Sequence, residues 1–171
     1  MDKLISAFWG MCRLKVAPQD LPVSSVLLGL AIAAYAVTSL FAAALQLPFE
    51  KAVLAAALDV GLLGTLSYLV LWIRMLTPRW TQTMTALAGT GAVIAVFMLP
   101  FIFWQANATT SETAFVPTVA LLGCMIWDMF IIGHIMRHAL NVPMLLGGTL
   151  AAVYIYISWR VFSVLLFTTP R

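Results

Sequence analysis

Residues 115–137 read FVPTVALLGCMIWDMFIIGHIMR. A mostly apolar run of about 20 residues is long enough to cross the hydrocarbon core of a bilayer as a helix. This run carries Asp128 near its middle and His134 close to its end. The stretch therefore predicts a membrane-spanning helix that holds an ionisable group inside the membrane.

The composition extends this interpretation to the whole chain. Of its 171 residues, 63% are hydrophobic and 9% are charged, whereas about a quarter of the residues in soluble domains are charged. A soluble core cannot cover so much apolar surface, but lipid can. We therefore predict an all-α, polytopic membrane protein with five transmembrane helices in a single membrane domain, residues 1–171. The predicted spans cover about 23–46, 51–74, 81–104, 115–137 and 142–167.

The residues before the first span predict a helix at the membrane surface. In MDKLISAFWGMCRLK, four polar or small residues recur at helical spacing: Lys3, Ser6, Gly10 and Arg13. They fall on one narrow face of a helix, and apolar side chains occupy the rest. We expect residues 1–16 to form an interfacial amphipathic helix. A signal peptide cleaved near FAAALQ, residues 41–46, is the alternative.

The basic residues predict how the chain crosses the membrane. With the N-terminus inside, six of them fall on the cytoplasmic side and two outside, which is the usual bias. We therefore expect a multi-pass membrane protein with its N-terminus cytoplasmic and its C-terminus outside. The net charge of +3 is spread over single residues, so we expect no nucleic-acid binding. The six are Lys3, Arg13, Lys15, Arg74, Arg79 and Arg137, and the two are Lys51 and Arg171.

Three ionisable residues fall inside the predicted spans: Asp59, Asp128 and Arg160. Each would cost about 2–4 kcal/mol facing lipid, so each should face other helices, a partner charge or a wet cavity. The depths of Asp59 and Arg160 allow a hydrogen-bonded pair. Asp128 has no basic residue at its depth, so a role in packing and a role in proton or substrate handling both stay open. Its available partners are Tyr35, Tyr154, Tyr156 and Ser67.

His134 and His138 are one helical turn apart, a spacing that can present two imidazoles to a metal ion. Two ligands do not complete a site, and both residues fall near the predicted inner interface. We therefore predict no metal site and no cofactor. His134 is rotated by about 240° from Asp128 around the helix, so these two residues do not share a face.

Small residues at helical spacing predict close packing between helices. Such residues let two helix backbones approach in lipid. They could hold the bundle together or bind a second protein, and we favour the bundle. The candidates are Ala57, Gly61, Gly64 and Thr65 in the second span, Gly89 and Gly91 in the third, and Gly147 and Gly148 in the fifth.

The segment APQDLPVSSVLL, residues 17–28, joins the surface helix to the first span. Through Asp20, Leu21 and Pro22 and the five-span topology, the chain resembles small bacterial inner-membrane proteins of the Yip1-like kind. The resemblance implies a protein of the bacterial inner (plasma) membrane. Eukaryotic members of that family act in vesicle traffic with small GTPases. The glycine that usually follows in the eukaryotic motif is absent here, and the N-terminal region is short, so the GTPase role is not carried over. From the residues alone, Asp20 is expected to cap the start of the first span.

Motifs that would identify an enzyme are absent from the sequence, including the P-loop, GxGxxG, GxSxG and HExxH. We therefore expect a non-enzymatic protein that organises the membrane or serves as an accessory subunit of a larger membrane complex. Its partners would be the lipid bilayer and a membrane protein or further copies of itself. The alternative is a small proton- or cation-coupled transporter or channel that uses Asp59 and Asp128.

Overall fold

The computed structural model describes residues 2–167, with side chains for residues 4–165. The side chain of Lys3 and the whole of Arg171, both counted in the charge bias, lie outside the described part. Helices make up nearly all of it, and five are long and apolar enough to cross a membrane. The predicted all-α fold with five spans is confirmed. The helices are α1 (Asp2–Cys12), α2 (Ser25–Ala44), α3 (Phe49–Ile73), α4 (Trp80–Ala106), α5 (Ser111–Leu140) and α6 (Met144–Phe162), with short turns η1 (Pro18–Asp20), η2 (Thr77–Arg79) and η3 (Ser163–Phe167).

Polar and proline residues set the helix boundaries. The Ser24 hydroxyl accepts a hydrogen bond from Leu27 N at 3.3 Å at the start of α2, and Thr110 caps α5 in the same way. Such caps satisfy backbone N–H groups that have no partner inside the helix. Asn141 has a φ of 56° and ends α5, because asparagine tolerates the left-handed conformation.

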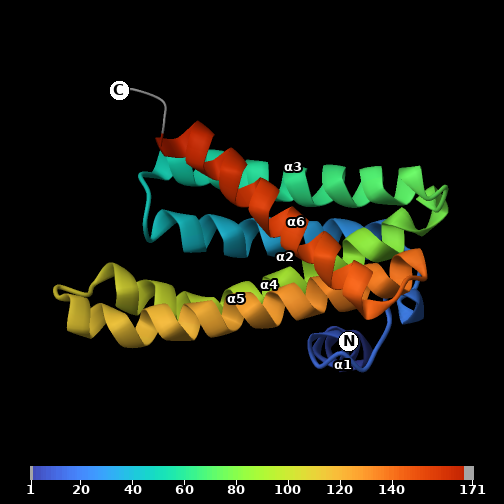
Figure 1. The fold of residues 1–171 in the computed structure, drawn as a ribbon, viewed down its shortest axis with the longest axis horizontal. Helices are drawn as coiled ribbons and strands as arrows, with labels where there is room; N and C mark the ends of the chain where they lie inside the picture. The colour runs from blue at the N-terminus through green and yellow to red at the C-terminus, as the bar shows by residue number, and fades with distance from the viewer. Residues whose placement is uncertain (1, 168–171) are drawn as a thin grey trace.

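Helix α4 lies at the centre of the bundle and packs against α1, α2, α3 and α5. The chain also forms two antiparallel pairs, α2 with α3 and α5 with α6. Figure 1 shows α2 to α5 running side by side, while α6 crosses them diagonally, from α5 at one end to α3 at the other. In the same view the α4–α5 turn extends beyond the α2–α3 turn. We call the end at which α2, α4 and α6 begin the inner end.

Helix α1 is docked on the flank of α4 and α5, and Figure 1 shows it nearly end-on, with its axis across those of the spans. Met11 and Cys12 are fully buried. The Phe8 ring occupies the space that a Cβ at Gly89 would take. Gly89 lies about 13 Å along α4 from its start, at about 1.5 Å per residue. The Trp127 indole Nε1 donates a hydrogen bond to Cys12 O at 2.8 Å, which ties the end of α1 to α5.

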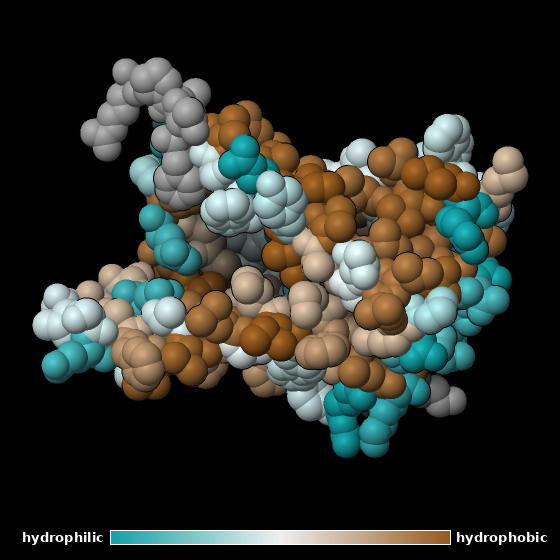
Figure 2. Space-filling model, in the orientation of Figure 1, coloured by the Kyte–Doolittle hydropathy of each residue, from teal (hydrophilic) through white to brown (hydrophobic). Residues whose placement is uncertain are grey.

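The outer surface of the spans is apolar. Large hydrophobic side chains such as Phe41, Leu69 and Val119 are exposed along α2, α3 and α5. Figure 2 shows hydrophobic residues over the middle of one face and hydrophilic residues gathered toward the ends and around α1. A surface of this kind is solvated by lipid chains. The chain is therefore an integral membrane protein whose helices contact the bilayer.

Candidate functional site

Four polar side chains from four helices meet near the middle of the bundle, and we call them the polar cluster: Tyr35 on α2, Asp59 on α3, Asp128 on α5 and Tyr154 on α6. Each lies about 15–21 Å from the inner end of its own helix, at about 1.5 Å per residue. That is close to the middle of a hydrocarbon core about 30 Å thick. All four are half-buried. Figure 2 shows the surface hollowed over α2, between α6 and α5.

Hydroxyl groups surround the Asp59 carboxyl. The Ser39 hydroxyl donates a hydrogen bond to Asp59 Oδ2 at 2.8 Å. The Tyr35 hydroxyl lies within hydrogen-bonding reach of the same carboxyl, and Tyr154 lies beside Tyr35. Arg160 is exposed, and no ion pair joins it to Asp59 among the described residues. The pair considered for Asp59 and Arg160 is therefore not formed, because α6 presents Tyr154 to the cluster and Arg160 to the outside.

Asp128 interacts with the other members of the cluster through its charge. It lies within electrostatic range of Asp59, Tyr35 and Tyr154. No hydrogen bond to its side chain occurs among the described residues, and no basic side chain pairs with it there. Of the partners considered for Asp128, Tyr35 and Tyr154 are near, whereas Tyr156 is exposed and the Ser67 hydroxyl donates to Gly64 O at 3.0 Å.

A further polar atom lies one turn beyond Tyr154. The Ser158 Oγ is buried and lies beside the Tyr154 side chain. Ser158 follows Tyr154 by four positions on α6, so both residues lie on the same helical face.

Gly91 makes room for the cluster. A Cβ at this position of α4 would lie 2.7 Å from Tyr35 Cε2, which is closer than van der Waals contact allows. The glycine therefore lets the Tyr35 ring pass across α4 and reach Asp59. Gly64 is packed less tightly than Gly91, since a Cβ at Gly64 would lie 3.7 Å from Met84 Cε, an ordinary van der Waals contact.

Three of the predicted packing residues are exposed on the surface of the bundle. Ala57, Gly61 and Thr65 are exposed on α3, and a Cβ at Gly61 would meet nothing within 4 Å. A close backbone approach instead joins α5 to α6, where a Cβ at Gly133 would lie 3.1 Å from Gly148 Cα. Gly133 did not stand out in the sequence, because it lies alone among large apolar residues.

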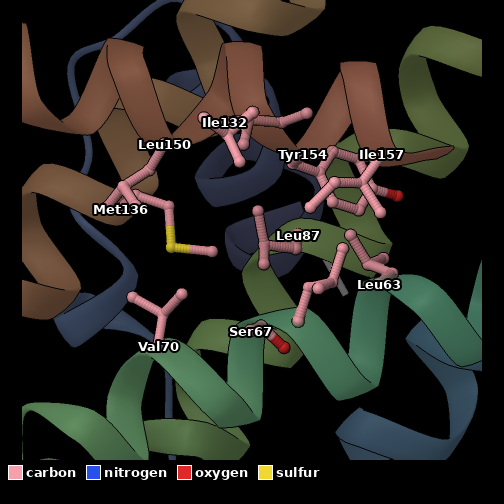
Figure 3. Close-up of a pocket in the computed structure, with 11 residues that line it drawn as sticks. Leu63, Ser67, Val70, Leu87, Ile132, Met136, Leu150, Tyr154 and Ile157 are labelled. Atoms are coloured by element: carbon pink, nitrogen blue, oxygen red, sulfur yellow. The ribbon is translucent and has the colours of Figure 1, made fainter. Parts of the chain in front are cut away.

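A narrow apolar cavity of about 50 Å³ borders the cluster on its inner side. Figure 3 shows side chains from α3, α4, α5 and α6 around it, including Val70, Leu87 and Met136. The Tyr154 ring lines one end, and its oxygen points away from the cavity. Apolar cavities of this size stay dry, so the cavity does not itself offer a site for an ion.

The two histidines hold the connection between α1 and α2 rather than joining the cluster. His134 is buried, and its Nε2 lies 3.1 Å from Val16 O. His138 packs edge-on against it, with ring centroids 4.6 Å apart. The described residues contain no group of three His, Cys, Asp or Glu side chains close enough to hold a metal ion.

Asp20 does not cap α2, and this expectation is corrected. Its Oδ2 accepts a hydrogen bond from Ala17 N at 3.0 Å and closes η1, whereas Ser24 caps α2. The reason is distance along the chain, because α2 begins only at Ser25.

Ser39, which donates a hydrogen bond to Asp59 of the polar cluster, is the residue that sequence reasoning missed. A signal for it exists, because Ser39 follows Tyr35 by four positions and so shares its helical face.

Comparisons with protein-family models, with curated proteins and with solved structures find no match to this chain.

Proposed function

We propose that this integral membrane protein binds a proton or a monovalent cation at the polar cluster and conducts it across the bilayer. The observation that carries the proposal is that two carboxyl groups, Asp59 and Asp128, lie within electrostatic range of each other, with no basic partner among the described residues. Carboxyl groups are costly inside a membrane and commonly mark ion or proton paths. Two negative charges in a medium of low dielectric constant repel each other. A bound proton or cation removes that repulsion.

The groups around the carboxyls fit this role. Tyr35, Ser39 and Tyr154 place hydroxyl oxygens beside the acids. Oxygen atoms are the ligands that hard cations such as Na⁺ prefer, and hydroxyls also relay protons. The buried Ser158 hydroxyl, beside the Tyr154 side chain, extends the row of polar atoms by one turn of α6, toward its outer end.

Flux through purified protein tests the proposal. The full chain is reconstituted in lipid vesicles, and proton, Na⁺ and K⁺ fluxes are followed after a gradient is imposed. We expect flux above that of empty vesicles, and we expect Asp59→Asn and Asp128→Asn each to reduce it to the empty-vesicle rate. Glu112→Gln is the matched control, because Glu112 is an exposed carboxylate in the first turn of α5. Wild-type flux no faster than that of empty vesicles contradicts the proposal.

A second candidate function, as an accessory or membrane-organising subunit, draws on the exposed small-residue face of α3. Ala57 on this face also borders a shallow groove between α2 and α3. Small exposed residues let a helix of another chain approach closely in lipid. Native mass spectrometry after gentle extraction tests this function, which predicts a stoichiometric complex that Gly61→Leu dissociates. Gly123→Leu is the control, since Gly123 is equally open but lies on α5. A monomer in the native membrane contradicts it.

A further inference from the structure

A hollow of about 520 Å³ lies at the inner end of the bundle, separate from the polar cluster. Cavities of about 300–1,000 Å³ are typical of small-molecule sites. The segment between α1 and α2 forms one wall, and the end of α5 and the start of α6 form the other. Its polar lining consists of Lys15, Asp20, His134, Arg137 and His138.

Hydrogen bonds fix the first wall against α5. Gln19 Nε2 donates to His138 O at 2.8 Å, and His134 Nε2 lies 3.1 Å from Val16 O. A carbonyl oxygen only accepts, so His134 Nε2 carries the hydrogen of this contact. These contacts hold the two walls of the hollow together in the folded chain.

The hollow carries an excess of positive charge. Lys15 and Arg137 contribute two positive charges and Asp20 one negative charge, which leaves one positive charge when both histidines are neutral. The Asp20 carboxylate is occupied by its own turn, because it accepts from Ala17 N at 3.0 Å. Neither the Lys15 ammonium nor the Arg137 guanidinium has a hydrogen bond or an ion pair among the described residues. Both groups are thus available to an anion.

We propose that this hollow binds the phosphate of an anionic lipid head group. Arginine presents a planar fork of donors that matches phosphate oxygens, and lysine adds a second positive charge. The hollow lies where α5 ends and α6 begins, which is the level of the head groups at the surface of the bilayer. Basic pockets between membrane helices at this level bind anionic head groups.

The apolar part of the lining of the hollow favours a lipid over a free phosphate as the ligand. Leu14 is 39% exposed, and Met144 on α6 is half-buried. These apolar side chains line the hollow together with the basic residues, so they can contact acyl chains while Lys15 and Arg137 bind the head group. The proposal does not rest on ion conduction by the polar cluster, because the two sites share no residue.

Binding to the purified full chain in neutral detergent tests the proposal with three probes. These are dioleoyl phosphatidylglycerol, phosphatidylcholine and inorganic phosphate at matched ionic strength. The readouts are the midpoint of thermal unfolding and the lipid retained in native mass spectrometry. We expect phosphatidylglycerol to raise the midpoint and to be retained, with phosphatidylcholine much weaker and phosphate without effect. A rise with phosphate as well assigns the same site to phosphate-bearing solutes, and no response to either anion overturns the proposal.

Variants locate the binding. We expect Arg137→Gln to weaken phosphatidylglycerol binding about tenfold, since a charged hydrogen-bond donor is lost. Glutamine keeps the Cβ that packs near Gly147, so the fold is retained. Lys15→Gln changes an exposed side chain and should weaken binding in the same direction. Arg74→Gln, which removes an exposed charge outside the hollow, is the control. Unchanged binding by both Arg137→Gln and Lys15→Gln overturns the proposal.

Discussion

The packing of Tyr35 against α4 requires a residue without a side chain at Gly91. We predict that Gly91→Ala lowers the stability of the folded chain by about 1–3 kcal/mol, because the added methyl group displaces the Tyr35 ring. Gly61→Ala is the control, and it should be neutral or slightly stabilising, since the site is open and alanine favours helix. Thermal unfolding in detergent compares the two. Equal midpoints for both variants would contradict this account of Gly91.

The Cys12 thiol is predicted to be unreactive. Burial, and then the nearby Asp128 carboxylate, raises its pKa from 9.0 to about 11. The thiolate fraction at pH 8 then falls about a hundredfold. In a Cys124→Ser variant, N-ethylmaleimide should therefore label Cys12 at least about a hundredfold more slowly in the native protein than in the SDS-unfolded chain. Rapid native labelling would mean that α1 is not docked.

At the residue scale, the sequence reveals the acids but not their surroundings. Asp59 and Asp128 are visible because a carboxyl group within an apolar run is costly. The rotation of each helix about its axis decides that Asp59 lies near Asp128 and that Arg160 does not lie near either of them. Helices that are apolar on all sides give no periodic signal for this rotation. Depth along a helix could be counted from the sequence, whereas direction could not.

Among the elements, the crossing of α5 and α6 depends on glycine. A Cβ at Gly147 would collide with the carbonyl oxygen of Gly133, and backbone atoms cannot move aside as a side chain can. We predict that Gly147→Ala lowers the free energy of unfolding by about 2 kcal/mol or more. This loss should be larger than the loss caused by Gly91→Ala. Gly148→Ala is the matched control, because its Cβ would meet nothing within 4 Å. Unfolding midpoints that do not separate Gly147→Ala from Gly148→Ala would contradict this.

The predicted spans match the observed helices in number and order, and they differ at the ends. The run predicted at 115–137 is a helix from Ser111 to Leu140. The apolar run marks the part that lipid surrounds, but the helix continues until caps end it, here at Thr110 and Asn141. Hydrophobic length therefore predicts the crossing, and capping residues set the true boundary.

For the whole molecule, the orientation stays a prediction with a direct test. The distribution of basic residues predicts a C-terminus outside the cell. Alkaline phosphatase fused after Arg171 should be active, and the same enzyme fused after Asn141 should be inactive, because one fewer span precedes it. Green fluorescent protein at the same two sites should give the opposite pattern. Fluorescence from the fusion after Arg171 would contradict the predicted topology, because it would place the C-terminus in the cytoplasm.

The resemblance to the Yip1-like family also stays a prediction. It depends on Asp20, Leu21 and Pro22 and on five spans. In the structure Asp20 closes η1, and Leu21 is buried where its carbonyl accepts a hydrogen bond from Gln82 Nε2 at 2.8 Å. These contacts give the segment a local structural role in joining α1 to α2, whichever family it comes from.

The pairing of α2 with α3 bears on how the chain enters the membrane during synthesis. Ser39 and Tyr35 lie on the helix made just before the one that carries Asp59. If the two helices insert as a hairpin, Asp59 reaches the lipid together with its hydroxyl partners and needs no later helix to shelter it. Asp128 differs, because Tyr154 follows it in the chain. In that case Asp59 enters the membrane together with its hydroxyl partners, whereas Asp128 enters before α6, which carries Tyr154, has been synthesised.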